Sequence, residues 1–202
     1  MNSSSDRAKR RPIAVAITGG VGAGKSETLA AFARHGAATI SSDDVVHDLY
    51  GDPGVRAALR ERYGDRVFTA GEVDRAALGR IVFADPDELA WLEGLLHPRT
   101  MARTEAWFEE LAQSPAPPAL AVNEVPLLYE TGSEERFDAV VVVTAPREVR
   151  EARAGARLDE REARLLPDEE KARRANFAYV NDGSLDDLDR FVSDVVDALA
   201  KR

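Results

Sequence analysis

A cluster of glycines with one lysine and one hydroxyl residue is the part of the sequence that most clearly suggests chemistry. Residues 17–28 read ITGGVGAGKSET, in which Gly19, Gly24, Lys25 and Ser26 match the pattern G-x-x-x-x-G-K-[ST]. Glycines let backbone N–H groups converge on phosphate oxygens, and the start of the following helix adds partial positive charge. Lys25 would reach the β and γ phosphates of a nucleotide, and the Ser26 hydroxyl would bind Mg²⁺. The pattern predicts a phosphate-binding loop rather than a glycine-rich turn without a ligand.

The fate of the phosphate depends on acidic residues elsewhere in the chain. Asp43 and Asp44 follow a short apolar stretch, where a second strand is expected to end. A carboxylate at this edge of an α/β sheet can orient an acceptor hydroxyl or take its proton during phosphoryl transfer. Aspartate is also a preferred helix N-cap, so position alone leaves both roles open for both residues.

Two more residues are candidates for binding a metal ion or a substrate. Glu124 ends the apolar stretch of a third strand, as in the Walker B pattern, where a carboxylate holds Mg²⁺ directly or through water. The alternative for Glu124 is a solvated strand end. His97 and Pro98 are expected to end a long helical block. His97 is either a substrate contact or a structural residue near a helix end, where its charge is favourable.

A row of arginines follows the fourth expected strand. Arg150, Arg153, Arg157, Arg161 and Arg164 are spaced by three or four residues, so they would share one side of a helix. Like charges at this spacing repel each other, which favours a surface that faces an anion. The row predicts a lid that closes over a triphosphate, with a solvated charged helix as the alternative.

The elements that must position these residues alternate between strands and helices. Helical spacing follows the glycine loop at 26–35 and returns near the end of the chain at 185–199. This alternation indicates an α/β fold with a mostly parallel sheet. Residues 52–113 show helical spacing and no strand signal, which predicts a helical insertion. Apolar runs predict strands at 13–18, 37–41, 119–122, 137–144 and 177–180.

Composition narrows the class of protein. The 202 residues suit one compact domain with an inserted arm. The absence of cysteine excludes disulfides and cysteine metal sites, and it fits a reducing cytoplasm. A net charge of −9 argues against general nucleic-acid binding, although a local cationic pocket can still bind a nucleotide. Residues 1–11 lack an apolar signal region and predict a disordered tail, and no stretch is long and apolar enough for a membrane span.

Together these motifs resemble the dephospho-CoA kinase family over about residues 13–188. The glycine loop is common to many P-loop proteins, whereas a helical block ending LLHP and followed by PLLYE is far more specific. The resemblance implies an adenylate-kinase-like P-loop NTPase fold, α/β/α with a five-stranded parallel sheet. It implies a nucleotide-binding core at 12–51 and 119–202 with a lid at about 150–170, and a helical CoA-binding arm at 52–118. The matching segments are ITGGVGAGKSE, SSDDVVHDL, DRAALGRIVFADPDELAWLEGLLHP, EVPLLYE, FDAVVVV and EEKARRANFAYVNDGSLDDL.

The resemblance also implies an activity. It implies transfer of the ATP γ-phosphate to the ribose 3′-hydroxyl of dephospho-CoA, the final step of coenzyme A synthesis, with Mg²⁺ as cofactor. The partners would be ATP and dephospho-CoA, with no nucleic acid and no membrane, in a cytoplasmic monomer or weak oligomer. The alternatives are a nucleoside or nucleotide kinase of the same fold and a non-catalytic nucleotide-binding protein. No N-K-x-D occurs, so the guanine-reading motif of GTPase switches is missing.

The resemblance assigns roles to single residues. The family's proposed catalytic base falls on Asp43, which favours it over Asp44. The catalytic set would be Asp43, Lys25, Arg153 and Arg157. The nucleotide-binding set would be Gly20, Gly22, Ala23, Gly24, Lys25, Ser26, Glu27 and Asn181, with Glu27 as a helix-start residue beside the nucleotide. The substrate-binding set would be Asp43, His97, Pro126, Leu127 and Leu128, and the Mg²⁺ set Ser26 and Glu124.

The sequence departs from the family pattern at a few positions. Ser41 stands where the family has an aspartate two residues before its catalytic aspartate, so Asp43 lacks a like-charged neighbour that would raise its pKa. Leu165 replaces a common glutamine, Asn176 replaces an aspartate, and the lid is several residues shorter. These differences bear on lid closure and adenine contacts more than on the phosphate chemistry.

Overall fold

The computed structural model describes residues 11–154 and 165–201, and within them the chain forms two compact units. The core unit comprises Met1–Ser41 and Phe108–Arg202, and the arm unit comprises Ser42–Trp107. The arm unit therefore begins ten residues before the predicted boundary at residue 52, because the helix that follows Ser41 belongs to it. Of the predicted tail, only Arg11 lies within the described residues.

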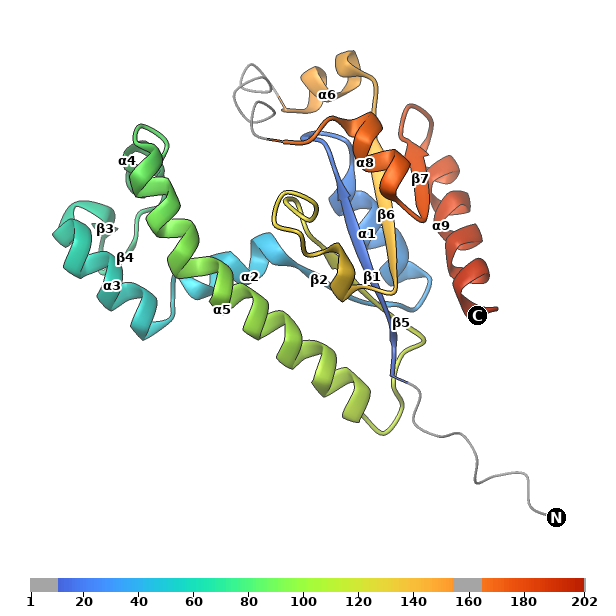
Figure 1. Cartoon of the computed structure of the whole chain (residues 1–202), viewed down its shortest axis with the longest axis horizontal. Coiled ribbons are helices and arrows are strands. Elements are labelled where there is room, and N and C mark those ends of the chain that lie inside the picture. The colour runs from blue at the N-terminus through green and yellow to red at the C-terminus, as the bar shows by residue number, and fades with distance from the viewer. Residues whose placement is uncertain (1–10, 155–164, 202) are drawn as a thin grey trace. The chain divides into compact units, whose positions relative to one another are not determined.

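A five-stranded parallel sheet forms the centre of the core unit, in the order β2-β5-β1-β6-β7 (Figure 1). All four neighbouring pairs are parallel, which confirms the predicted α/β fold. β1 is the central strand, so the glycine loop at its carboxyl end leaves the middle of the sheet, where open α/β sheets bind their ligands. The strands are β1 (Ile13–Gly19), β2 (Ala38–Ser41), β5 (Leu120–Glu124), β6 (Ala139–Thr144) and β7 (Phe177–Val180).

Helices cover both faces of this sheet. On one face, Val15 and Ile17 pack in a core with α1 (Lys25–Arg34) and α9 (Leu185–Ala200). On the other face, Ala16 packs in a second core with Leu128 and with Ala172 of α8 (Asp168–Arg174). Successive strand residues point to opposite faces, so a sheet buried on both faces needs uninterrupted apolar runs such as those in β1 and β6. Helix α6 (Arg147–Ala154) follows β6, and a 3₁₀ turn spans Glu134–Arg136.

Helix α9 illustrates how the core is held together. Leu188, Val192, Val195 and Leu199 are 0–1% exposed, and their spacing of three and four residues places them on one side of the helix. Each such side chain contributes about 1.5–3 kcal/mol when fully buried. The Ser184 hydroxyl accepts from the N–H of Asp187, whose carboxylate accepts from the N–H of Ser184, so a capping box begins the helix.

The arm unit consists of helices and one small hairpin (Figure 1). Aspartate side chains begin two of its helices: Asp52 accepts from the N–H groups of Gly54 and Val55, and Asp74 accepts from those of Ala76 and Ala77. The expectation that residues 52–113 contain no strand is wrong, because two two-residue strands pair here. The elements are α2 (Ser42–Leu49), α3 (Pro53–Tyr63), a 3₁₀ turn (Gly64–Val67), β3 (Phe68–Thr69), β4 (Glu72–Val73), α4 (Arg75–Val82) and the larger part of α5 (Pro86–Gln113), whose residues from Phe108 onward belong to the core unit.

Both corrections in this unit have a physical reason. Strands of two residues are too short to show a period in sequence, and the turn between β3 and β4 is set by the positive φ of Ala70 and Gly71. The expectation that His97 and Pro98 end a helix is also wrong, because α5 continues through Pro98. Proline removes one hydrogen bond from a helix. Leu92 and Leu96 before it and Thr104 after it are buried, so packing holds the helix on both sides.

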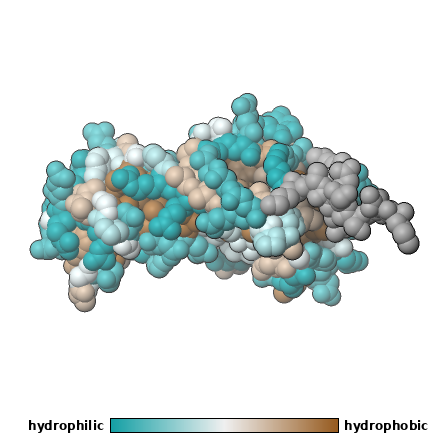
Figure 2. Space-filling view, turned by 90° about the horizontal axis from the view of Figure 1, so that it is seen from below, coloured by the Kyte–Doolittle hydropathy of each residue, from teal (hydrophilic) through white to brown (hydrophobic). Residues whose placement is uncertain are grey.

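On the face shown in Figure 2 hydrophilic residues predominate, and apolar residues show mainly between them. Among the described residues, four large apolar side chains are exposed, namely Phe83, Met101, Val180 and Leu185. In the same part of the chain, no helix combines the length and the apolar character that a membrane crossing requires.

Candidate active site

The glycine loop connects the end of β1 to the start of α1, as the sequence pattern predicts. Gly24 precedes the helix with φ of 102°, a conformation that residues with a Cβ rarely adopt. A Cβ at Gly24 would also overlap Nδ2 of Asn181. Glycine is therefore required at this position for two independent reasons, backbone conformation and close approach.

Side chains that are distant in sequence donate hydrogen bonds to the backbone of the loop. The buried Asn181 donates from Nδ2 to the carbonyl oxygen of Ala23 at 2.8 Å, and its own N–H donates to Thr144 at 2.7 Å. Arg153 on α6 donates to the carbonyl oxygen of Gly22 at 3.3 Å. The structure thus brings Asn181, assigned to the nucleotide-binding set, and Arg153, assigned to the catalytic set, to the same loop.

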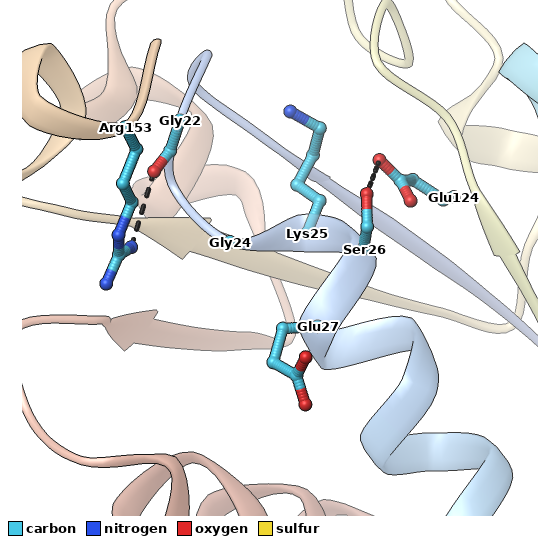
Figure 3. Close-up of a pocket in the computed structure, with 7 residues that line it drawn as sticks. All are labelled: Gly22, Gly24, Lys25, Ser26, Glu27, Glu124 and Arg153. Atoms are coloured by element: carbon cyan, nitrogen blue, oxygen red, sulfur yellow. Dashed lines mark hydrogen bonds between the residues drawn. The ribbon is translucent and has the colours of Figure 1, made fainter.

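Lys25 and Ser26 begin α1 and present the two groups that the loop chemistry needs. The Lys25 ammonium donates to the carbonyl oxygens of Gly19 and Gly20 at 3.2 and 3.0 Å, so its charge lies against the loop. The Ser26 hydroxyl donates to Oε1 of Glu124 at 3.5 Å, and Figure 3 shows the two side chains pointing toward each other. Glu124 ends β5 and is 5% exposed, so it is buried at the carboxyl end of the strand and is not a solvated strand end.

These two side chains fit part of a Mg²⁺ site. Mg²⁺ prefers oxygen ligands and usually keeps several waters beside one or two protein groups and substrate phosphates. A serine hydroxyl and a buried carboxylate at hydrogen-bond distance supply such a protein contribution. Among residues 11–154 and 165–201, no group of three or more histidine, aspartate or glutamate side chains could hold a metal ion. The remaining ligands would have to be phosphate oxygens and water.

A pocket of about 230 Å³ lies at the loop and is lined by Gly22, Gly24, Lys25, Ser26, Glu27, Glu124 and Arg153. Glu27 points away from Lys25 and Ser26 in Figure 3, and its carboxylate accepts a hydrogen bond at 3.2 Å from Arg34, about two turns further along α1. The Glu27 side chain therefore pairs with another residue of α1. The lining otherwise combines two cations, glycine backbone, one hydroxyl and the Glu124 carboxylate, which suits phosphate oxygens together with a metal ion.

Two further charged residues lie at the loop: Arg150, which belongs to the predicted arginine row but was given no role of its own, and Asp168, which was not singled out from the sequence. A Cβ at Gly20 would lie 2.8 Å from Oδ2 of Asp168 and 3.0 Å from Nη1 of Arg150, so both side chains crowd this glycine. Arg150 also donates from Nε to the carbonyl oxygen of Ala145 at 3.0 Å. The arginine row contained a signal for Arg150, whereas nothing in the sequence indicated Asp168.

The segment after β5 is held in place chiefly by packing and backbone contacts. Leu128 is fully buried in the core beneath the sheet, so its side chain positions the segment rather than lining the surface. The carbonyl oxygen of Pro126 accepts from the Thr18 hydroxyl at 3.3 Å, and that of Leu127 from the Thr131 hydroxyl at 2.8 Å. Glu130 forms an ion pair with the fully buried Lys171 of α8 at 2.8 Å.

The remaining predicted residues lie in the arm unit or outside the described chain. Asp43 and Asp44 are both exposed in the first turn of α2, where the helix dipole favours carboxylates. His97 is half-buried within α5. Arg157, like Arg161 and Arg164, lies outside the described residues.

One departure from the family pattern has a structural explanation. The side-chain oxygen of Asn176 accepts from the N–H of Val140 at 2.8 Å, and its own N–H donates to Val140 at 3.0 Å. An aspartate at this position could accept the same hydrogen bond, so asparagine preserves the contact at the start of β7.

Comparisons with known proteins agree with this geometry. A family model described as dephospho-CoA kinase matches residues 13–187. A dephospho-CoA kinase from Frankia casuarinae is 40% identical over 198 residues, covering 93% of this chain and 84% of that protein. The dephospho-CoA kinase from Rhodopseudomonas palustris strain CGA009 is 38% identical over 196 residues, covering 94% and 96%.

Solved structures show the same fold. The crystal structure of TT1252 from Thermus thermophilus superposes with a TM-score of 0.76 at 34% identity, covering 94% of this chain and 99% of that one. The family model spans nearly the whole chain, including the glycine loop, the arm unit and the segment after β5. The chain therefore belongs to the dephospho-CoA kinase family.

Proposed function

We propose that this chain transfers the γ-phosphoryl group of ATP to the ribose 3′-hydroxyl of dephospho-CoA, giving ADP and coenzyme A. The 3′-oxygen forms a bond to the γ-phosphorus while the bond to the β-γ bridging oxygen breaks. The observation that carries the proposal is the placement of Lys25, Ser26 and Glu124 at a phosphate loop in a chain that matches the family from residue 13 to 187.

On the donor side, backbone N–H groups of the loop and the Lys25 ammonium bind the phosphates. Arg153, whose guanidinium contacts the loop at Gly22, neutralises charge on the transferring group. Arg157 is proposed to join it from the lid, which excludes water so that transfer outcompetes hydrolysis. Mg²⁺ held by Ser26 and Glu124 would offset the negative charge of the β and γ phosphates.

On the acceptor side, Asp43 orients the 3′-hydroxyl and accepts its proton. Its position supports this role, because it follows β2 by two residues, and the last residue of that strand, Ser41, pairs in register with Glu124. His97 and the segment Pro126–Leu128 are proposed to bind the remainder of dephospho-CoA. For the buried Leu128, this contribution would come through positioning of the backbone.

The proposal is tested by ADP release from purified protein with Mg²⁺ and ATP. Dephospho-CoA, AMP, CMP, adenosine and no acceptor are compared at equal concentration, and coenzyme A is identified by mass. We expect turnover with dephospho-CoA to exceed that with every other acceptor by at least about 100-fold, a factor that a pocket can reach even for substrates that differ by one small apolar group. Faster turnover with a nucleotide would identify a nucleotide kinase instead, and release without any acceptor would identify an ATPase.

The proposed setting is a cytoplasmic enzyme that is a monomer or a weak oligomer. The cysteine-free sequence supports a reducing compartment. Light scattering coupled to size exclusion, with and without ATP, would measure the oligomeric state, and fractionation of cells would test the location.

A further inference from the structure

The unexpected feature of the phosphate loop is a carboxylate. Asp168 lies beside Gly20, with its two side-chain oxygens 2.8 and 3.1 Å from the position that a Cβ on Gly20 would take. Arg150 approaches the same point, and its Nη1 lies 3.9 Å from Oδ2 of Asp168. Lys25 donates to the carbonyl oxygen of Gly20 from the helix side. Two cations and one anion therefore meet at a glycine of a loop that is built to bind anions.

Asp168 is held at this place by the helix that it begins. Lys171, one turn further along α8, forms the ion pair with Glu130, and Arg174 pairs with Glu134 and stacks over the Tyr129 ring at 4.3 Å. Lys171 is fully buried, so leaving this position would expose a charged pair that is now enclosed. Because α8 is fixed in this way, Asp168 can leave Gly20 only by rotating its side chain.

The surroundings of Asp168 do not fully stabilise its negative charge. Its side chain is 19% exposed, and among the described residues its one charge partner within 4 Å is Arg150, itself 13% exposed. Burial raises the pKa of the Asp168 carboxyl, while the charges of Arg150, Lys171 and Lys25 lower it and that of Glu169 raises it. The cations do not outweigh burial, so this carboxylate is less stable in its charged form than an exposed aspartate.

A simpler interpretation is that Asp168 only favours the start of a helix. Carboxylates in a first turn are stabilised by the helix dipole. However, Glu169 and Glu170 occupy the same turn and would serve that purpose without crowding the loop. The close approach to Gly20 distinguishes Asp168 from these two glutamates, and it places negative charge beside a glycine of the predicted phosphate loop.

We propose that Asp168 is a resident anion of the phosphate loop, which pairs with Arg150 in the absence of nucleotide and opposes phosphate binding through like-charge repulsion. The inference rests on the proposed function, because it assumes that the loop binds nucleoside phosphates. When a nucleotide binds, its phosphates pair with Arg150 and Lys25. The Asp168 carboxylate must then rotate away or bind a proton. Nucleotide affinity is thereby kept below what the loop alone would give, which favours release of ADP after transfer.

The test is calorimetric binding of ADP, without acceptor, to the full chain and to two variants. Asp168→Asn keeps the shape of the side chain and removes its charge. Glu169→Gln removes one charge from the next position of α8, which is exposed, and serves as the matched control. We expect Asp168→Asn to lower the Kd for ADP by about five- to tenfold, the size of an interaction between two unit charges about 4 Å apart that is screened as strongly as in water. We expect Glu169→Gln to change the Kd by less than about twofold.

A second ligand locates the effect. Inorganic pyrophosphate, used as a competitor of ADP, should bind more tightly to Asp168→Asn by a similar factor, because only the phosphate end of the nucleotide would lie near Asp168. Unchanged or weaker ADP binding in Asp168→Asn would overturn the inference, since Asp168 would then be neutral or needed to orient Arg150. A gain for ADP without a gain for pyrophosphate, or an equal gain in Glu169→Gln, would overturn it as well. Failure of the unmodified chain to bind ADP would instead contradict the proposed function.

Discussion

Charged side chains are used differently in the core unit and in the arm unit. In the core, Lys25, Arg150 and Asp168 gather around the backbone of one loop, where burial raises the pKa of the carboxyl. In the arm, Arg62 lies 2.7 Å from Glu88, and the hydrogen bonds from Arg62 and Tyr63 lower the pKa of that carboxyl. The Glu88 carboxylate of the arm is thus stabilised by its local partners, whereas the cations around Asp168 at the loop do not outweigh its burial.

This difference separates structural charges from functional ones. A carboxylate that accepts good hydrogen bonds stabilises the fold in its charged form. Charges that are left partly uncompensated cost stability, and they are typically found where a ligand supplies the missing partner. By this criterion we expect the ligand of the core unit to bind at the loop. The exposed Asp43 does not meet the criterion, so its proposed role is tested by substitution.

The largest expected effect comes from the arm unit. Asp43→Asn removes the proposed base while keeping the size of the side chain, so we expect kcat to fall by about 10²–10⁴-fold, the usual contribution of general base catalysis. The Kd for ADP should stay within about twofold. Asp44→Asn is the matched control, since it removes a neighbouring charge from the same helix turn, and it should retain most of the turnover. Near-normal turnover in Asp43→Asn would assign the acceptor hydroxyl to another group.

The corresponding change in the core unit should affect binding as well as rate. Lys25→Ala removes the ammonium that lies against Gly19 and Gly20, so both the developing charge and the bound phosphates lose a partner. We expect about a 10²–10³-fold loss of kcat together with a weaker Kd for ADP, measured by steady-state kinetics and calorimetry. Normal ADP binding by Lys25→Ala would contradict the assignment of phosphate binding to this lysine of the core unit.

A third comparison concerns stability, with one ion pair from each unit. Lys171→Met breaks the enclosed pair with Glu130 and leaves a buried carboxylate, so we expect a loss of about 3–5 kcal/mol in the free energy of unfolding. Arg62→Met breaks the more exposed pair with Glu88 and should cost much less.

Urea unfolding of both variants measures this difference. The double variant Lys171→Met with Glu130→Leu should recover most of the loss, because no unpaired charge then stays buried. Equal losses in Lys171→Met and Arg62→Met would show that the buried pair is not special.

The smallest effect is a pH dependence within the core unit. Asp138 accepts from Arg11 and from the N–H of Ala14, and the hydrogen bond from Arg11 is the main cause that lowers its pKa below 3.8. A lowered pKa in the folded state means stability that is present above the ordinary pKa and is lost as the pH falls through the folded value. Asp138→Asn should therefore lower the Tm at pH 7, and the difference from the unmodified chain should shrink below about pH 4.

The pKa shift of Asp168 has the opposite sign to that of Asp138, and so does its effect on stability as the pH changes. Its raised pKa means that the charged form weakens the folded state, so the cost appears as the pH rises from 3.8 through the folded value. Asp168→Asn should have an equal or higher Tm than the unmodified chain at pH 7. Thermal unfolding between pH 3 and 7 checks both residues, and parallel curves for all three proteins would contradict the contrast between them.

The sequence predicted those features that local residue types specify. The glycine loop, the five parallel strands and the helices on either side of them follow from apolar runs, helical spacing and a required pattern of glycines. These signals are local because backbone conformation at Gly24 and burial of a run such as AVVVV depend on the residues themselves. The hairpin in the arm and the continuation of α5 through Pro98 were missed, because the first is too short for a period and the second depends on packing.

The contacts that complete the loop were decided by tertiary structure alone. Asn181 supports Ala23 across 158 residues of sequence, Lys171 pairs with Glu130 from another segment, and Asp168 lies beside Gly20. No spacing rule links these positions, because strand order and helix packing bring them together only after the sheet has formed. The sequence by itself therefore predicted a phosphate-binding loop and its position, whereas the charges that we propose to regulate phosphate binding depend on how the helices pack around the loop.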